Sequence, residues 1–394
     1  MPLKVWQFDP AQITPYYNLS LCEALASIGC DVRYISSHFL YDDKLEISDA
    51  ITADYHYFNL LNDRRWLRYP SLRKVLRAAS YPFEHVALAR KIAADPPDVF
   101  HVQWSRLPLF DSWLLDRVKA LNIPVVYTVH EIIPLFTSEA VKAQLGQVYR
   151  KADALLFHTD SNREDFHMIF PDFPRDHLHV IPHLTLNNAV APAGATREMA
   201  RERLNFPNDV PIFLFFGSLR PYKGVDVLID AFARVAQKRP DARLMIVGNP
   251  GSREEIPSLD KLGKFRSHLY MRPEYVPFDQ TWLYHLAADV IVLPYRTVYQ
   301  SGALLTSMGY ARPVIVTDVG GFPETVEGNG WIVPPENPAR LAEAMLDAIS
   351  DPERLARMGQ RSLELLNERH NPITIARQLV DLYQRLVQAA PATS

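Results

Sequence analysis

A loop rich in cations and glycine follows an apolar run in the second half of the chain. It runs Gly-Ser-Leu-Arg-Pro-Tyr-Lys-Gly from Gly217 to Gly224, between an expected strand and an expected helix. Glycine lets the backbone approach a ligand closely, and the side chains of Arg220 and Lys223 can neutralise a diphosphate. Because backbone amides at helix N-termini favour anions, the segment predicts an anion-binding site. An ordinary turn with solvated charges is the alternative, and the chain has neither a Walker loop nor a G-x-G-x-x-G motif.

Two further segments place polar groups at expected helix starts. Gln300, Ser301 and Gly302 follow an apolar run and open a helix, where a Ser-Gly pair presents amides and a hydroxyl to an anion. A simple N-cap would use Ser301 equally well. Glu324 follows a double-glycine turn, and a carboxylate in a first helical turn also complements the helix dipole.

Short apolar runs alternate with helical periodicity along the whole chain, and these elements must position the loops. Strands are expected at residues 3–8, 31–35, 99–102, 124–128, 154–158, 179–181, 212–217, 242–247, 267–271, 290–293, 313–317 and 330–333. Helices fit at residues 17–29, 109–121, 139–151, 225–238, 279–287, 302–310, 338–350, 352–366 and 373–387. The alternation predicts an α/β fold with two doubly wound, Rossmann-like domains, each a parallel sheet with helices on both faces.

A small, polar stretch at residues 184–197 interrupts this pattern and is interpreted as a linker. We therefore expect an N-terminal domain over residues 1–190 and a C-terminal domain over residues 198–372. Residues 373–394 are expected to form a last helix. A length of 394 residues fits two or three domains.

Composition excludes several classes of protein. The hydrophobic fraction of 48% and the charged fraction of 22% are ordinary for a globular protein. A net charge of −3 argues against a general nucleic-acid binder, so no nucleic-acid partner is expected. Two cysteines allow neither a disulfide framework nor a cysteine-based zinc site. No apolar run approaches 18 residues and the N-terminus lacks a signal-peptide pattern, so a cytoplasmic enzyme is expected.

A basic stretch stands apart from this composition, because residues 64–77 carry six basic side chains and no acidic one. The six are Arg64, Arg65, Arg68, Arg73, Lys74 and Arg77, interleaved with apolar side chains such as Trp66. A solvated helix face is one interpretation. The other is a surface for an anionic lipid or a phosphate-bearing acceptor.

The second half of the chain resembles the retaining, nucleotide-sugar-dependent glycosyltransferases of the GT-B fold, the group 1 or family 4 set. The resemblance rests on GSLRPYKGVDVLIDAF, RLMIVG, YVP, AADVIVLP, QSG and ARPVIVTDVGGFPE, in that order and spacing. It is specific over residues 212–335 and looser over DVFHV, VYTVHE and VIPH in the first half. It implies two domains facing a cleft, the donor bound mainly by the C-terminal one and the acceptor by the N-terminal one. The last helix is then expected to cross back to the N-terminal domain.

The resemblance also implies roles for individual residues. Catalytic roles fall to Arg220 and Lys223, on the donor diphosphate, and to His130, facing the donor sugar; a satisfied structural histidine is the alternative for His130. Donor-binding roles fall to Gly217, Ser218, Tyr275, Val276, Gln300, Ser301, Gly302, Thr306 and Glu324. The acceptor or membrane surface would comprise Tyr16, Asn18 and the basic stretch, namely Arg64, Arg65, Trp66, Arg68, Arg73, Lys74 and Arg77.

Three departures from the family pattern bear on these roles. Paired glutamates are common in the family, but their positions hold Val298 and Thr306; a known subset carries Gln-Ser-Gly here instead. Recognition of the ribose and sugar is then left to Gln300 or Glu324. The arginine common after the strand glycine is replaced by Ser218, and residues 9–18 lack the usual glycine pair, which points to an unusual acceptor.

We therefore expect a hexosyltransferase-type enzyme of polysaccharide biosynthesis. It would move a sugar from a nucleotide-diphosphate sugar to a glycan, lipid-linked or small-molecule acceptor with retention of configuration. The chain has no D-x-D motif, so the cations are expected to replace a metal and no cofactor is expected. Peripheral contact with the inner face of the plasma membrane would follow from the basic stretch. The alternatives are another enzyme on the same fold, either a nucleotide-sugar epimerase or a phosphorylase, and a non-catalytic GT-B-like binding protein.

Overall fold

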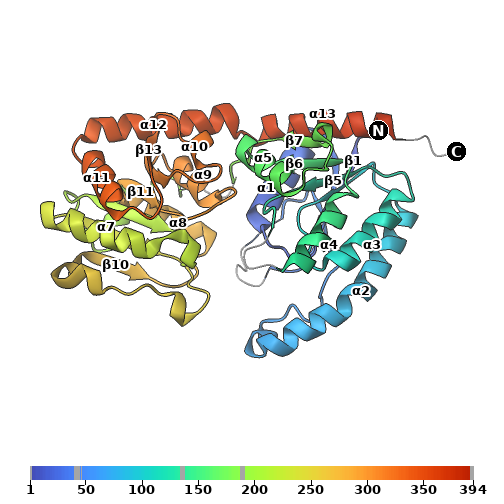
Figure 1. Ribbon diagram of the computed structural model, residues 1–394, viewed down its shortest axis with the longest axis horizontal. Coiled ribbons are helices and arrows are strands. Elements are labelled where there is room, and N and C mark those ends of the chain that lie inside the picture. Colours follow the sequence, from blue (N-terminus) through green and yellow to red (C-terminus); the bar gives the residue numbers. More distant parts are fainter. Residues whose placement is uncertain (1, 40–44, 46, 134–137, 187–190, 391–394) are drawn as a thin grey trace. The chain divides into compact units, whose positions relative to one another are not determined.

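The computed structural model describes residues 2–39, 45, 47–133, 138–186 and 191–390, and for Arg64 and Leu67 it describes the backbone alone. The chain divides into two compact units (Figure 1). The first comprises Met1–Leu184 together with Asn371–Ser394, and the second comprises Thr185–His370. Of the stretch interpreted as a linker, residues 187–190 lie outside the described residues.

The described strands of the first unit form one parallel sheet in the order β3-β2-β1-β4-β5-β6-β7. They are β1 (Lys4–Asp9), β2 (Asp31–Ser36), β3 (Thr52–Tyr55), β4 (Val99–Val102), β5 (Val125–Thr128), β6 (Ala154–Phe157) and β7 (Leu178–Val180). The strand order reverses between β1 and β4. In doubly wound sheets such a reversal opens a crevice at the carboxyl ends of the two strands.

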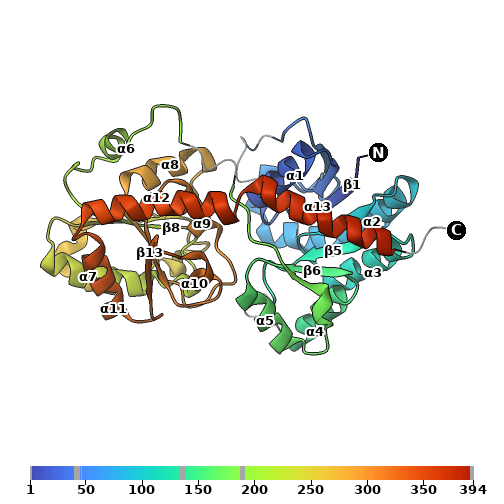
Figure 2. The ribbon, with the colours of Figure 1, turned by 90° about the horizontal axis from the view of Figure 1, so that it is seen from above.

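Helices cover both faces of this sheet. They are α1 (Pro15–Ser27), α2 (Pro70–Ala94), α3 (Pro108–Lys119), α4 (Glu139–Tyr149), α5 (Asp160–Ile169) and α13 (Pro372–Ala389). The last helix, α13, packs beside α1, as Figure 2 shows, whereas α2, α3 and α4 pack in succession. The hydroxyl of Tyr383 in α13 lies 2.6 Å from Nδ1 of His101 in β4. The C-terminal helix is thereby bound to the first sheet.

The described strands of the second unit form a parallel sheet in the order β10-β9-β8-β11-β12-β13. They are β8 (Ile212–Phe216), β9 (Arg243–Val247), β10 (Leu269–Arg272), β11 (Val290–Leu293), β12 (Val314–Thr317) and β13 (Gly330–Val333). Here the order reverses between β8 and β11. Two doubly wound α/β sheets confirm the fold class predicted from the sequence.

The second sheet is also covered on both faces. Its helices are α6 (Arg197–Arg203), α7 (Val225–Lys238), α8 (Thr281–Ala287), α9 (Gly302–Gly309), α10 (Phe322–Thr325), α11 (Pro338–Ala348) and α12 (Pro352–Arg369). Helix α7 packs against α11, and α9 packs against α12. Among the described helices of the chain, none combines the length and apolarity needed to cross a bilayer.

Residue pattern explains why these segments fold as they do. The apolar runs of β11 and β12 are buried along their whole length, as strands covered on both faces must be. Each fully buried leucine, isoleucine or phenylalanine contributes about 1.5–3 kcal/mol. Proline opens α1, α2, α3, α11, α12 and α13, where its missing N–H costs nothing. Six of the 31 prolines of the chain thus mark the first residue of a helix.

The basic stretch of residues 64–77 forms two elements instead of one helical face. Its first part is a 3-10 turn, η1 (Arg64–Arg68), capped by Asp63, whose carboxylate accepts from the Arg65 N–H at 2.8 Å. Helix α2 begins only at Pro70. Strand β3 was not among the expected strands, because its side chains are exposed or half-buried at the sheet edge.

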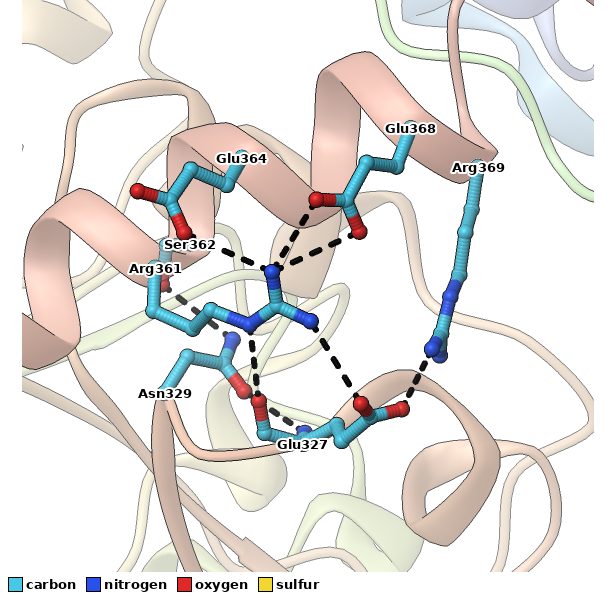
Figure 3. A network of polar contacts seen from close by, with 7 residues as sticks. All are labelled: Glu327, Asn329, Arg361, Ser362, Glu364, Glu368 and Arg369. Carbon is cyan, nitrogen blue, oxygen red and sulfur yellow. Dashed lines mark hydrogen bonds and ion pairs between the residues drawn. The ribbon is translucent and has the colours of Figure 1, made fainter.

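A polar network fixes α12 to the turn before β13 (Figure 3). Arg361 forms ion pairs with Glu327, Glu364 and Glu368, and Arg369 also pairs with Glu327. Beneath them, the buried Asn329 donates to the Ser362 hydroxyl at 3.2 Å. Exposed ion pairs contribute about 0–1 kcal/mol each, so the buried amide is the stronger constraint on this helix.

Candidate functional site

The cationic loop predicted from the sequence lies at the point where the second sheet reverses its strand order. It follows β8, and Tyr295 follows the neighbouring strand β11. Lys223 Nζ donates to the Tyr295 hydroxyl at 2.9 Å and lies 4.2 Å from the centre of its ring. Burial favours the neutral amine, but the oxygens of Tyr295 and Tyr222 outweigh it and raise the pKa of Lys223. Lys223 is therefore a cation at neutral pH, held between the loops that follow β8 and β11.

Close backbone contacts join the loops around this lysine. Gly224 has a φ of +66°, and a Cβ there would lie 2.0 Å from the carbonyl oxygen of Pro294. Gly320 has a φ of +50°, and a Cβ there would lie 1.7 Å from the carbonyl oxygen of Val298. A side chain at either position would push the loops apart. The loops after β8, β11 and β12 are thus packed backbone to backbone, with Lys223 between the first two.

Arg220 lies in the same loop and is bound to a carboxylate. Its Nη1 lies 2.6 Å from Oε1 of Glu255, in the 3-10 turn η4 (Arg253–Glu255) after β9. The other oxygen of Glu255 is buried without a hydrogen-bond partner among the described residues. The Arg220 side chain remains 47% exposed. Because a guanidinium carries five N–H donors, Arg220 can contact a phosphate while it keeps Glu255.

The start of α9 has an N-cap and, next to it, a side-chain hydrogen-bond donor that is not used. Ser301 accepts from the Leu304 N–H at 3.3 Å, so it is the N-cap that the simpler interpretation proposed. Gln300 accepts from the Ser301 N–H at 2.8 Å, but its Nε2 is buried without a partner among the described residues. A Cβ added at Gly302 would meet nothing within 4 Å. Open space and an unused amide donor therefore occur together at this helix start.

The remaining predicted donor-binding residues lie in different surroundings. Gly217 and Ser218 are half-buried at the start of the cationic loop. Val276 and Thr306 are buried, Val276 within the core and Thr306 in α9. Tyr275 is half-buried beside Val276, and Glu324 is exposed in the first turn of α10.

In the first unit, His130 lies after β5 inside an aromatic cluster. Its ring stacks on Trp104 with centres 5.1 Å apart, and the ring of Tyr17 meets it edge-on at 4.9 Å. Nε2 of His130 lies 3.0 Å from Gln103 Oε1, so this nitrogen carries the proton and donates it. Burial, followed by the neighbouring His158, holds the pKa of His130 well below its usual value. His130 is therefore a neutral imidazole whose Nδ1 can accept a hydrogen bond.

The first loop of the chain is organised by a buried carboxylate that the sequence analysis did not single out. Asp9 accepts from the Ile13 N–H at 2.7 Å and from Asn18 Nδ2 at 2.8 Å. Burial raises the pKa of Asp9 to about 6. Asn18 is itself buried and also donates to the Tyr34 hydroxyl, so it supports this loop from within. Tyr16 packs edge-on against Phe39.

The sequence analysis did not identify several residues near the two strand-order reversals, and the reason is the same for each. No motif marks these residues, and the strand order places them: Gln103, Trp104, Tyr295 and Glu255. The available signal was position: each follows a strand at or next to a reversal point. Within the described part of the chain, no cluster of three or more histidine, cysteine or acidic side chains could hold a metal ion.

Buried neutral histidines give the fold a pH dependence. Burial lowers the pKa of His101 to about 3 and that of His285 to about 4, so unfolding near pH 5 takes up protons at both. Stability contributed by these groups is present above pH 6.5 and is lost as the pH falls toward their folded pKa values. Each contributes a slope of up to about 1.4 kcal/mol per pH unit. Asp9 has the opposite effect on stability. Because its pKa is raised, the folded protein holds about one proton more at this group than the unfolded chain does between pH 4 and 6.

We therefore predict that urea unfolding midpoints fall from pH 7.5 to pH 5.0. His285→Phe keeps a ring beside Tyr310 but removes the titrating group, so it should flatten the slope. Midpoints that stay constant over this range, in tryptophan fluorescence, would contradict the neutral histidines.

Comparison with known proteins finds a glycosyltransferase model in each unit of the chain. A model described as "Glycosyltransferase Family 4" matches residues 16–184, and one described as "Glycosyl transferases group 1" matches residues 210–351. The alpha-D-kanosaminyltransferase of Streptomyces kanamyceticus is 25% identical over 303 residues, which cover 73% of this chain and 76% of that protein.

Solved structures agree on the fold. A glycosyltransferase from Rickettsia africae superposes with a TM-score of 0.77 at 17% identity, covering 98% of this chain and 99% of that one. Anabaena HepE in complex with UDP-glucose superposes with a TM-score of 0.74 at 15% identity, covering 97% and 100%. With the two domain models and the two reversed parallel sheets, these matches support one assignment: the chain is a glycosyltransferase of the GT-B fold.

Proposed function

We propose that the protein transfers a sugar from a nucleotide-diphosphate sugar to an acceptor hydroxyl, with retention of anomeric configuration. The observation that carries the proposal is Lys223, a cation held by Tyr295 at the strand-order reversal of the second sheet. A diphosphate bound there would meet Lys223, the exposed donors of Arg220 and the start of α9. The fold match to a protein solved with UDP-glucose is consistent with this class of donor.

Charge explains how this arrangement would accelerate the reaction. The acceptor oxygen bonds to the anomeric carbon as the bond from that carbon to the diphosphate breaks. The hydroxyl proton passes to the departing phosphate oxygen on the same face of the sugar, which retains the configuration. Negative charge grows on the diphosphate in the transition state. Fixed cations near that charge stabilise it more than they stabilise the bound substrate.

Two neutral groups complete the proposal. The unused amide N–H of Gln300 is assigned to an oxygen of the sugar-nucleotide substrate. His130 is assigned to a substrate hydroxyl, with Nδ1 as the acceptor of a hydrogen bond. Because the imidazole is neutral, its contribution is orientation of the substrate and not charge.

Removing the lysine tests the charge directly. We expect Lys223→Ala and Lys223→Met to reduce turnover by about one to three orders of magnitude, because the transition state loses its cation. Tyr295→Phe keeps the ring and should cost less, about tenfold. Lys238→Ala, an exposed lysine at the end of α7, is the matched control and should keep full activity. The measurement is nucleotide release from UDP-, GDP- and ADP-sugars, with circular dichroism to show that the variants fold. Full activity in both Lys223 variants would show that the lysine does not contribute to the reaction and would contradict its place in the donor site.

Metal independence is part of the proposal, since Lys223 and Arg220 would take the place of a cation cofactor. Activity after dialysis against EDTA should remain above about half of the untreated value, because no metal bridges the diphosphate in this scheme. A loss that magnesium or manganese alone restores would overturn the metal-free scheme and leave the sugar transfer itself standing.

A further inference from the structure

A pocket of about 380 Å³ lies in the first unit, at the N-terminal half of α2. Its lining includes four cations, Arg73, Lys74, Arg77 and Arg106, and no acidic residue among the side chains that the structure describes. Phe58 and Leu107 supply part of its apolar wall. Four like charges around one cavity repel one another, and an anion between them would relieve this repulsion.

Two of these cations are held in place by the segment after β3. Arg73 donates from Nε to the carbonyl oxygen of Leu61 at 3.0 Å and from Nη2 to Asn62 Oδ1 at 3.2 Å. The guanidinium carbon of Arg77 lies 3.9 Å from the centre of the Phe58 ring. Long side chains fixed in this way lose little freedom when they bind a ligand, and a planar guanidinium suits the oxygens of a phosphate.

The opposite wall is built around a buried carboxylate. Asp111 accepts from the backbone N–H groups of Arg106 at 2.9 Å and Leu107 at 3.0 Å, and from the Ser105 hydroxyl at 2.6 Å. The hydroxyl of Tyr81 donates to its other oxygen at 2.6 Å. One oxygen of Asp111 therefore holds the loop that carries Arg106, and the other is bound to α2 through Tyr81 and through Nε2 of His85 at 3.0 Å.

Backbone strain occurs at the same pocket. Phe58 has a φ of +59°, in the left-handed region that bulky residues rarely adopt. Its N–H donates to Glu84 Oε1 at 2.9 Å, and its ring stacks on Tyr81 with centres 5.9 Å apart. Strain of this kind costs about 1–3 kcal/mol and persists where the surroundings impose it, often at ligand clamps.

We propose that this pocket binds the phosphate group of the acceptor, a phosphate ester whose apolar or ring-shaped remainder packs on Phe58 and Leu107. The proposal rests on the sugar transfer proposed above, because only that reaction makes the bound phosphate ester an acceptor. One loop links the pocket to His130, because Trp104 stacks on His130 and Arg106 lines the pocket two residues later. Two residues span at most about 7 Å, so an acceptor anchored by its phosphate would extend toward His130.

The phosphate ester has two conceivable sources, a soluble metabolite and a lipid. Exposed apolar side chains on α2 make the lipid source worth testing: Leu72, Val75 and Phe83 are 51%, 64% and 77% exposed and share one helical face. Both sources present the same group to the cations, so the binding experiment carries one arm for each.

The experiment measures binding without any donor. Phenyl phosphate is the soluble probe and phenol its neutral counterpart, both followed by calorimetry at low salt. Vesicles of phosphatidylcholine with and without phosphatidic acid are the lipid probe, followed by co-sedimentation. The test variant is Arg77→Gln/Arg106→Gln, and Arg90→Gln, exposed on the same helix outside the pocket lining, is the matched control.

We expect phenyl phosphate or phosphatidic acid vesicles to bind the wild type and Arg90→Gln, and the double variant to bind at least tenfold more weakly. Binding of phenyl phosphate alone assigns a soluble acceptor, and binding of vesicles alone assigns a lipid-linked one. If the wild type binds neither probe, or if the double variant binds as tightly as the wild type, the proposed phosphate site is wrong.

The donor site provides the second readout. Nucleotide release from the sugar donor, measured as hydrolysis without acceptor, should be unchanged in the double variant, because Lys223 lies in the other unit. With a phosphate-bearing acceptor, the double variant should raise the acceptor KM at least tenfold at nearly constant kcat. Pocket binding without any sugar transfer by the wild type would retain the pocket and reject the proposed function.

Discussion

The contact between the loops after β8 and β11 is the constraint on which the proposed donor site depends. Gly224 brings the first loop so close to Pro294 that no side chain fits between them, and the same approach allows Lys223 to reach Tyr295. The hydrogen bond and the surrounding aromatic rings keep the ammonium charged and in place. A cation that is positioned before the substrate arrives requires no reorganisation in the transition state, which is why such groups contribute strongly to catalysis.

The first unit uses the same topology for a different chemistry. Its reversal point, between β1 and β4, gathers neutral polar groups and aromatic rings: Gln103, Trp104 and Tyr17 around His130. Its cations lie further along, where Asp111 holds the loop that carries Arg106.

Much of the fold could be predicted from the sequence, and the reason is physical. Strands buried on both faces, such as β11 and β12, must be continuous apolar runs, so periodicity finds them. The edge strand β3 was not predicted, because the side chains of its Thr-Ala-Asp-Tyr sequence are exposed or half-buried and form no apolar run. The cationic loop was recognisable because glycine and lysine must stand at fixed spacing. Tyr295 and Glu255 were not, since a residue that acts by holding another has no motif. The pocket on α2 was foreshadowed by its basic residues, but Phe58 and Arg106 are distant in sequence and only folding brings them together.

The central claim is that Lys223 binds the diphosphate of the donor. Its most direct test is calorimetric titration of a nucleoside diphosphate and of the parent nucleoside, with wild type and Lys223→Met compared. If the lysine contacts the diphosphate, the variant should lose at least tenfold in affinity for the diphosphate, because one charge-assisted contact is removed, and should bind the nucleoside as before. Equal affinity of wild type and variant for the diphosphate would contradict the claim.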